Sequence, residues 1–339
     1  MKKHLQLAAI ILLAFSLTGC AESSAPTEET PSQTQALLPE SDAPLLKEGE
    51  TVTISGECQF HVDYVAISEH PELYYEADAG KTYAEFCITF QNLADYTVNA
   101  SNVMRGKLIY SGMYEYGGND TVTDEDGLFS SPAHWFDMDP SDSMQIHYFF
   151  LVPKEVQDSS RTVELNMNIC ENEYRVIVRE GEKGVVPASG SASISDKTSG
   201  EIGSEDVVVT DNAEFYVEHA VFTKKATPLS PGTAYNYYEA EDGKIFLDFC
   251  VAYTNRASQK MEAGKAVSAD LDQAEAAVSV TELSNRSAFE DYSNVAVVLP
   301  LCTEYIHCIF QVPEELETNS EPVTVSFKID GNRYTYSVK

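Results

Sequence analysis

The sequence predicts an all-β protein that contains two tandem antiparallel β-sandwich domains. Short segments alternate between apolar and polar residues with a period of two, which is typical of half-buried strands. Turn-forming residues separate these segments. One pattern of nineteen residues occurs twice, at 74–92 and at 237–255, and further matches flank both copies. A repeat of this extent indicates a duplicated domain.

The chain begins with a segment that has the layout of a secretory signal. Two lysines precede an apolar run at 5–15, which is too short for an ordinary membrane-spanning helix. The segment ends in LTGC at 17–20, which resembles the lipobox of bacterial lipoproteins. This resemblance implies that residues 1–19 are a removable signal peptide. It also implies that Cys20 carries a diacylglyceryl anchor in the cell membrane, with the protein on the extracytoplasmic side. An ordinary secretory signal followed by a simple thiol is the alternative.

The charge of the chain restricts its partners. Its 22 basic residues oppose 54 acidic ones, for a formal net charge of −32. Such a field repels nucleic acid and anionic lipid headgroups, so we expect no nucleic-acid partner. We interpret the acidity as a solvated surface that keeps the protein soluble, and attraction of a cationic ligand is the alternative. No later stretch approaches eighteen uninterrupted apolar residues, so no transmembrane helix is expected after Cys20.

Two stretches that are poor in apolar residues divide the mature chain. Residues 20–50 contain the lipidated cysteine and a tether rich in Ser, Thr, Pro and Glu, a composition that does not fold by itself. A flexible linker at 181–210 separates a first domain at 51–180 from a second at 211–339. Each domain has about 130 residues, enough for a core of its own.

The two copies of the repeated pattern predict equivalent strands. At 84–90 and at 247–253, large apolar residues occupy every second position. The opposite face carries acids and one cysteine in each copy. The sequence DGN at 330–332 favours a tight hairpin near the end of the chain. We expect a short helix at 269–277, where an alanine-rich sequence replaces the β-formers.

Several of these motifs together resemble one group of bacterial domains. They are the tyrosine-rich approach to the repeated strand, the pattern E-A-x-x-G-K before it, the V-P-x-E at 152–155 and 312–315, and the closing hairpin. They are similar to an uncharacterised domain of Firmicutes surface lipoproteins, itself similar in fold to immunoprotective extracellular antigens of mycobacteria. The resemblance implies two tandem immunoglobulin-like sandwiches and supplies no active site. The single tryptophan, Trp135, and the lack of a Cys–Trp–Cys spacing depart from the antibody pattern.

Six cysteines follow Cys20, three in each domain. Only Cys87 and Cys250 correspond between the copies, so no shared disulfide is predicted, and we expect free, half-buried thiols at both positions. Because each domain has an odd number of cysteines, at least one thiol in each is unpaired or pairs across the two copies. His147 and His307 also correspond, but each stands alone in an alternating strand, and we interpret them as satisfied or surface histidines rather than ligands. Because neither C-x-x-C nor H-E-x-x-H occurs, we expect no metal and no cofactor.

The motifs of common enzymes are missing from the sequence. It contains no G-x-S-x-G, no P-loop and no Rossmann fingerprint, so we expect no catalytic residues, although distant residues can still assemble a triad. The acidic clusters at 119–126 and 137–142 are interpreted as solvated loops, with a calcium site as the alternative.

Aromatic residues gather between the repeat blocks of the first domain and alternate with glycines. Exposed aromatics on loops are typical of recognition surfaces, and core filling is the alternative. The predicted binding surface consists of Tyr110, Tyr114, Tyr116, Phe129, Trp135 and Phe136. The matching region of the second domain, 262–294, has almost no aromatic residues, so we expect that domain to extend and present the first.

These features predict a membrane-anchored, extracytoplasmic bacterial lipoprotein that acts as a non-catalytic binding or envelope-associated module. Its partners are the membrane, through Cys20, and an extracellular or envelope ligand. One alternative is a structural spacer, favoured if neither domain has a pocket or an exposed aromatic patch. A solute-capturing lipoprotein usually has two α/β lobes, which this strand-rich chain does not suggest. An envelope hydrolase would need titratable groups in a concave pocket.

Overall fold

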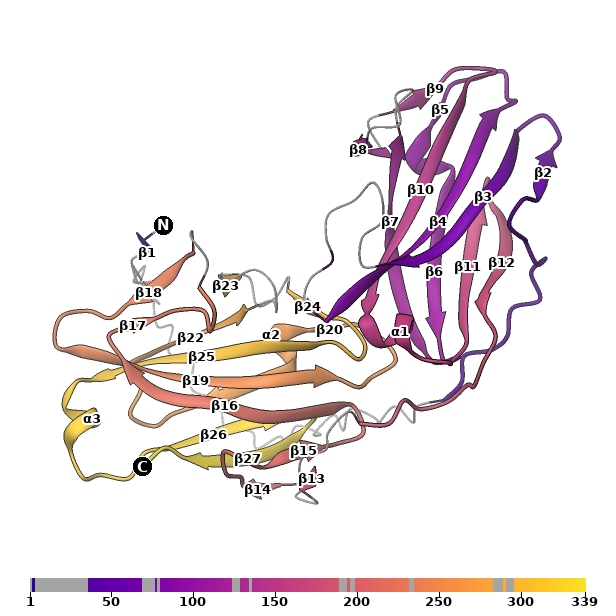
Figure 1. The fold of residues 1–339 in the computed structure, drawn as a ribbon. Helices are drawn as coiled ribbons and strands as arrows, with labels where there is room; N and C mark the ends of the chain where they lie inside the picture. Colours follow the sequence, from indigo (N-terminus) through magenta and orange to yellow (C-terminus); the bar gives the residue numbers. More distant parts are fainter. Residues whose placement is uncertain are drawn as a thin grey trace, which may run out of the picture.

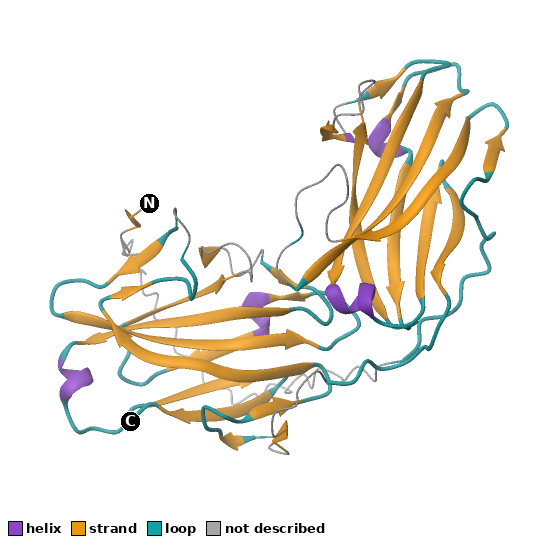
Figure 2. Cartoon of the chain, in the orientation of Figure 1, coloured by secondary structure: helices purple, strands orange, loops and turns teal. Residues whose placement is uncertain are grey.

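The computed structural model of the chain describes residues 2–3, 36–68, 77, 80–123, 129–133, 136–188, 194–195, 199–231, 235–282, 289–290 and 296–339. Strands dominate these residues and the helices are short (Figures 1 and 2), so the prediction of an all-β fold with antiparallel sheets is confirmed. Within these ranges, no helix is long and apolar enough to cross a membrane. The predicted lipobox and Cys20 lie outside the described residues.

The first unit is a folded sheet around one hydrophobic core. Its elements are β2 (Thr51–Ile54), β3 (Cys58–Ser68), β4 (Lys81–Asn92), β5 (Val98–Asn99), the 3-10 helix η1 (Ala100–Asn102), β6 (Met104–Tyr110), β7 (Tyr114–Thr123), β8 (Phe129–Pro132), β9 (Asp137–Met138), β10 (Ser143–Pro153), α1 (Lys154–Asp158), β11 (Val163–Ile169) and β12 (Asn172–Arg179). The strand order is β12-β11-β6-β7-β10-β4-β3-β2, and β8 adds to β7. The two halves of this sheet face each other, since Phe60 on β3 packs edge to face on Tyr174 of β12.

The second unit is a sandwich of two sheets. Its elements, together with β1 (Lys2–Lys3), are β13 (Ile194–Ser195), β14 (Gly200–Glu201), β15 (Val207–Val209), β16 (Ala213–Thr223), β17 (Lys225–Ala226), β18 (Tyr237–Glu239), β19 (Lys244–Asn255), β20 (Met261–Glu262), α2 (Ala263–Ala266), β21 (Val267–Asp270), β22 (Ala276–Glu282), β23 (Phe289–Glu290), β24 (Val297–Val298), β25 (Thr303–Pro313), α3 (Glu315–Thr318), β26 (Thr324–Ile329) and β27 (Asn332–Ser337). A large sheet, β13-β15-β16-β19-β25-β22-β23, encloses a core with the smaller sheet β14-β27-β26-β21.

The helix expected at 269–277 is not present, and that prediction is wrong. The segment contains the end of β21, a turn and the start of β22. Pairing decides this outcome, because Val267 and Ala269 lie opposite Ile329 and Phe327 of β26. Tertiary pairing therefore overrides the local helix preference of alanine.

A β-bulge in the first long strand of each unit determines which side chains face outward. The register shifts between Val62 and Tyr64 on β3, and again between Val217 and His219 on β16. Val62 and Val217 point into the two cores. Because a bulge inserts one extra residue, two consecutive side chains after each valine face away from the core. Tyr64 and His219 therefore join the outer faces of their sheets.

Each central strand ends in a buried asparagine that organises the next loop. The side-chain nitrogen of Asn92 donates to the carbonyls of Tyr96 and Met138 at 2.9 and 3.0 Å, and its Oδ1 accepts from the backbone of Ala94 at 2.9 Å. Asn255 makes the equivalent three hydrogen bonds in the second unit. These bonds explain why both copies of the repeated pattern end in asparagine.

The two units contact each other through a buried junction. Lys81 Nζ lies 2.7 Å from Glu304 Oε1, and both side chains are buried. The hydroxyl of Tyr116 donates to the carbonyl of Pro300 at 3.0 Å. Leu299 also packs against the core of the first unit. The junction therefore combines an ion pair, a hydrogen bond and apolar packing.

We predict that Asn92→Ala and Asn255→Ala each lower the free energy of unfolding by about 3 kcal/mol, because three buried hydrogen bonds of about 1 kcal/mol each are lost. Urea denaturation of the full chain measures the change. The control is Asn212→Ala, which removes a hydrogen bond to Asp330 at the surface and should cost less than about 1 kcal/mol. Equal losses in all three variants would contradict the prediction.

Candidate metal centre

The predicted aromatic binding surface is wrong for the residues whose side chains the structure describes. Three of them are completely buried and one is half-buried against the same core: Tyr110, Tyr114 and Tyr116, and then Phe136. Trp135 and the side chain of Phe129 lie outside the described residues. The first unit therefore uses these aromatic rings as core.

Strand alternation explains why these tyrosines are buried. Gly112 takes a left-handed backbone, φ +69°, in the turn between β6 and β7, so the segment forms a hairpin rather than a recognition loop. Tyr114 and Tyr116 are two residues apart on β7 and face the same core. Buried hydroxyls need partners, and the Tyr110 hydroxyl donates to Ser159 Oγ at 2.8 Å.

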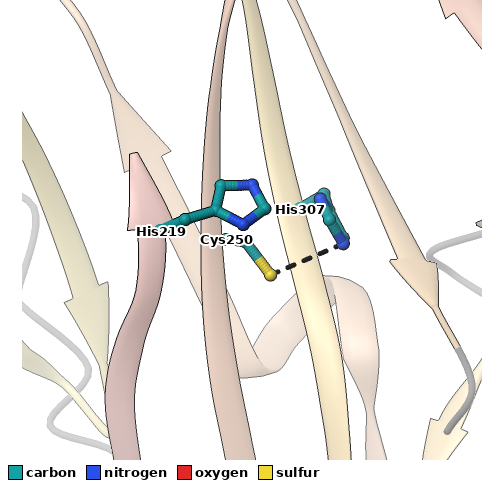
Figure 3. Close-up of side chains that lie close together, drawn as sticks. All are labelled: His219, Cys250 and His307. Atoms are coloured by element: carbon teal, nitrogen blue, oxygen red, sulfur yellow. Dashed lines mark hydrogen bonds between the residues drawn. The ribbon is translucent and has the colours of Figure 1, made fainter. Parts of the chain in front are cut away.

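A cluster of titratable groups lies instead on the outer face of the large sheet in the second unit. His219 on β16, Cys250 on β19 and His307 on β25 are directly opposite one another on three neighbouring strands (Figure 3). One ligand atom from each lies within 4.8 Å of the others, and this is the one such group of His, Cys and acidic residues in the described part of the chain.

Two acids complete the cluster. Asp248 Oδ1 accepts a hydrogen bond from His307 Nδ1 at 2.9 Å, and Asp248 Oδ2 lies 3.1 Å from His219 Nε2. His307 Nε2 lies 3.4 Å from Cys250 Sγ and 3.4 Å from Glu282 Oε2. The carboxylate of Asp248 therefore spans both imidazoles, and the second nitrogen of His307 faces the sulfur.

The cluster is largely shielded from solvent. Cys250 and His307 have no exposed surface, Asp248 and Glu282 are buried, and the His219 side chain is 21% exposed. His219 Nε2 is itself buried and, despite its approach to Asp248, makes no hydrogen bond of normal geometry. A buried nitrogen without a hydrogen bond is costly unless another group binds it.

Burial and charge shift the ionisation of these groups in opposite directions. Burial raises the pKa of the Cys250 thiol to about 11, although His307 opposes the shift. Burial alone would lower the pKa of His307, but Cys250, Asp248 and Glu282 together raise it well above its ordinary value. Burial would likewise raise the pKa of Asp248, and the two histidines hold it below its ordinary value. The cluster therefore favours the charged forms of His307 and Asp248, whereas burial favours the neutral thiol of Cys250.

The first unit has different side chains and hydrogen bonds at the positions equivalent to this cluster. Tyr64 stands where the second unit has His219, and its hydroxyl donates to Glu85 Oε1 at 2.7 Å. The same oxygen lies 2.7 Å from His147 Nδ1, and His147 Nε2 lies 2.5 Å from the hydroxyl of Thr123. Both ring nitrogens of His147 therefore have partners within the protein.

The thiol of this first cluster is also less well placed. Cys87 Sγ lies 3.9 Å from His147 Nε2 and points its hydrogen toward Asp63 Oδ2 at 3.6 Å. Burial, followed by the charges of Asp63 and Glu85, raises the pKa of Cys87. The first cluster is a satisfied polar network.

The distances in the second unit also resemble a Cys–His–Asp catalytic relay. A cysteine nucleophile must be ionised and must reach its substrate. Cys250 is completely buried, so a substrate has no access to its sulfur. The arrangement therefore suits a bound ion better than nucleophilic catalysis.

Sequence reasoning found most of these residues without finding that they meet. Cys87 and Cys250 are free thiols, as expected, but both are completely buried rather than half-buried. The interpretation of His147 as a satisfied histidine agrees with its hydrogen bonds. The view of His307 as a histidine standing alone is wrong, because strand pairing places it opposite Cys250. The sequence pattern gives no signal for His219, because the bulge before it interrupts the period of two.

The acidic cluster at 137–142 forms a hydrogen-bonded loop. Asp137 Oδ1 accepts from Asn99 at 2.8 Å, and Asp139 Oδ1 accepts from Thr97 at 2.7 Å. These carboxylates are exposed and partly satisfied by the protein, which agrees better with a solvated loop than with a calcium site. Part of the other cluster, 124–126, lies outside the described residues.

Comparisons with known proteins give structural neighbours only. No family model and no curated protein matches the chain. The chain is similar to the solved structure of an uncharacterised β-sandwich protein from Clostridium difficile 630, with 21% identity and a TM-score of 0.38, over 42% of this chain and 98% of that one. It is also similar to a conserved hypothetical protein from Bacillus anthracis, with 12% identity and a TM-score of 0.28, over 39% of this chain and 93% of that one. Neither description names an activity.

Proposed function

We propose that this protein is a lipid-anchored, extracytoplasmic, non-catalytic module of two tandem immunoglobulin-like units, and that its second unit binds one zinc-type transition-metal ion. The observation that carries the proposal is the convergence of His219, Cys250 and His307 on one point of the sheet. A thiolate and two imidazoles are donors that zinc and copper prefer. Calcium and magnesium prefer oxygen ligands, so they fit this site poorly.

The spacing of the donor atoms agrees with tetrahedral coordination of an ion. Zinc lies about 2.3 Å from a thiolate sulfur and about 2.0 Å from an imidazole nitrogen, which places the two donor atoms about 3.5 Å apart at a tetrahedral angle. Cys250 Sγ and His307 Nε2 are 3.4 Å apart. The ligand atoms of the whole trio lie within 4.8 Å of one another, so each pair is at most about 1.5 Å from the spacing of a tetrahedral zinc site.

Asp248 supplies the support that metal-binding histidines usually have. Such a histidine commonly donates its other N–H to a carboxylate, which fixes the ring and its tautomer. Asp248 holds His307 through Nδ1, which leaves Nε2 directed at the sulfur of Cys250. Its second oxygen lies beside Nε2 of His219, which leaves Nδ1 of that ring for the ion, on the side that faces Cys250 in Figure 3.

Glu282 is the acid beside the remaining ligand position, although it does not belong to the trio whose donor atoms lie within 4.8 Å of one another. Its Oε2 lies 3.4 Å from His307 Nε2, next to the position of the ion, and the backbone N–H of Leu229 donates to the same oxygen at 2.7 Å. Together with the thiolate of Cys250, this carboxylate neutralises a divalent ion, and such compensation is needed for charges in a buried site. A shift of Glu282 toward the trio would give four protein donors and close the site, as in structural zinc sites.

The other parts of the proposal rest on the sequence and on the repeated strand register. The lipobox at 17–20 supports the lipid anchor and the extracytoplasmic address. The shared motifs, and the bulge and register that recur on β3 and β16, support tandem duplication. Because Tyr64 replaces the histidine in the first unit, one ion is expected for each chain.

A structural spacer is the second candidate function. The burial of Tyr110, Tyr114 and Tyr116 removes the aromatic patch that favoured ligand recognition. In this alternative the metal ion stabilises the outer unit of a rigid extension from the membrane. Both functions share the anchor and the metal centre.

We predict that the reduced full-length chain binds one Zn²⁺ and that His219→Tyr, which copies the first unit, weakens binding by more than about 100-fold because a direct ligand is lost. Asp248→Asn should weaken binding by about 10- to 100-fold, since only the support of the ligands changes. Competition with a chromophoric chelator measures the affinity.

The matched controls for this titration lie in the first unit. Tyr64→Phe and Cys87→Ser change the equivalent positions there and should leave both the stoichiometry and the affinity unchanged. Two ions per chain, or unaltered binding in a folded His219→Tyr variant, would refute the metal centre.

We predict that Cys20→Ala moves the protein from the membrane fraction to the soluble extracytoplasmic fraction, because two acyl chains hold a protein at a bilayer and their loss removes the anchor. Detergent phase partitioning and labelling with a radioactive fatty acid measure the change. A variant that remains in the membrane fraction would show that lipidation of Cys20 is not the anchor.

A further inference from the structure

Two thiols of the first unit meet far from the metal centre. Cys58 begins β3 and Cys170 lies in the turn between β11 and β12, 112 residues later, and their sulfur atoms are 2.8 Å apart. This separation is shorter than ordinary contact between unbonded sulfur atoms, so only a small approach of the two side chains is needed to reach the disulfide bond length of about 2.05 Å. We propose that Cys58 and Cys170 are a modification site, which a disulfide donor converts into an intramolecular disulfide.

The backbone holds both cysteines in place. Cys170 and Glu171 have positive φ angles, 48° and 62°, as in the tight two-residue turns that close β-hairpins. The backbone N–H of Cys170 donates to the carbonyl of Val103 at 3.0 Å, which fixes the turn against the neighbouring strand. Cys58 pairs on one side with Ile54 and on the other with Asn92. The two sulfur atoms are therefore brought together by the sheet rather than by a mobile loop.

The second unit links the corresponding strand and hairpin by hydrogen bonds instead of by sulfur atoms. Asp330 occupies the turn position that corresponds to Cys170, with a φ of 51°, and Gly331 follows with a φ of 76°. The carboxylate of Asp330 accepts hydrogen bonds from the backbone and side-chain nitrogens of Asn212 at 3.2 and 3.0 Å. Asn212 directly precedes the strand that matches β3. Both units therefore link the start of this strand to the last hairpin, and the first unit uses two sulfur atoms.

The two thiols have different access and different acidity. Cys170 is partly exposed and Cys58 is buried. The hydrogen bond from Cys58 lowers the pKa of Cys170, whereas the same contact and burial raise the pKa of Cys58. Since the thiolate is the attacking species in disulfide exchange, Cys170 is the thiol that reacts first with the donor.

The exchange needs an external disulfide, which can be a small-molecule disulfide or an oxidised dithiol protein. The Cys170 thiolate attacks one sulfur of this donor, a mixed disulfide forms, and the first donor thiolate leaves. Cys58 then loses its proton and attacks the Cys170 sulfur, and the second donor thiolate leaves. Two electrons reduce the donor, and the two protons of the cysteines end on its two thiols.

The bond would join the two facing halves of the first sheet. It connects β3 with the hairpin of β11 and β12 and closes a loop of 112 residues. Closing so long a loop removes much of the conformational freedom of the unfolded chain. We therefore expect the oxidised first unit to melt roughly 10 °C above the reduced one.

The test uses the full-length chain with Cys20→Ser, purified under reduction and then treated with oxidised glutathione. The protein is then unfolded in denaturant without a reductant, alkylated and mapped by mass spectrometry. We expect a linked pair of peptides that contain Cys58 and Cys170, with the other four of the six cysteines alkylated. The Cys58→Ser variant should instead retain glutathione on Cys170, because the resolving thiol is missing.

Cys302→Ser is the matched control, since Cys302 is also buried but lies in the second unit, and it should leave the link intact. Six alkylated cysteines, a link to any other cysteine, or a Cys58→Ser variant without the glutathione adduct would each overturn the proposal. The readout does not depend on the metal centre, so zinc binding can fail while the disulfide forms, and the reverse also holds.

Discussion

The register of three neighbouring antiparallel strands is the constraint on which the candidate site depends. Side chains alternate between the two faces of a strand, so a slip of one residue would turn Cys250 and His307 into the core. The pairing of β19 with β25 is continuous from Lys244 to Thr254, and Val251 and Ile306 on the inner face belong to the core. Burial of that inner face therefore fixes the outer cluster, and the bulge on β16 adds His219 to it.

The two units show how one scaffold can hold either of two polar arrangements. In the first unit, Tyr64 forms a hydrogen bond with Glu85, and Thr123 forms one with His147. The groups that would otherwise bind an ion therefore already have partners within the protein. In the second, His219 has a buried nitrogen without a hydrogen bond, and Asp248 holds His307 so that its free nitrogen faces a thiol. An ion bound to Nδ1 of His219 would hold this ring with its Nε2 against Asp248, and it would compensate the buried negative charges of the cluster.

The strands could be predicted from the sequence because alternation is a local signal. The site could not, because Cys250 and His307 are 57 residues apart and only the sheet register brings them together. The bulge before His219 interrupts the period of two, which hides that residue from a pattern search. The glycines around Tyr114 and Tyr116 favour a surface loop, yet on β7 the spacing of two residues between these tyrosines is the core pattern.

The identity of the atoms around the ion is the most direct test of the metal centre. X-ray absorption at the zinc edge measures it on the reduced, zinc-loaded full-length chain. We predict one sulfur at about 2.3 Å, from Cys250, with the remaining nitrogen and oxygen ligands at about 2.0–2.2 Å. A first shell of nitrogen and oxygen alone, or one with two or more sulfur atoms, would contradict a centre formed by His219, Cys250 and His307.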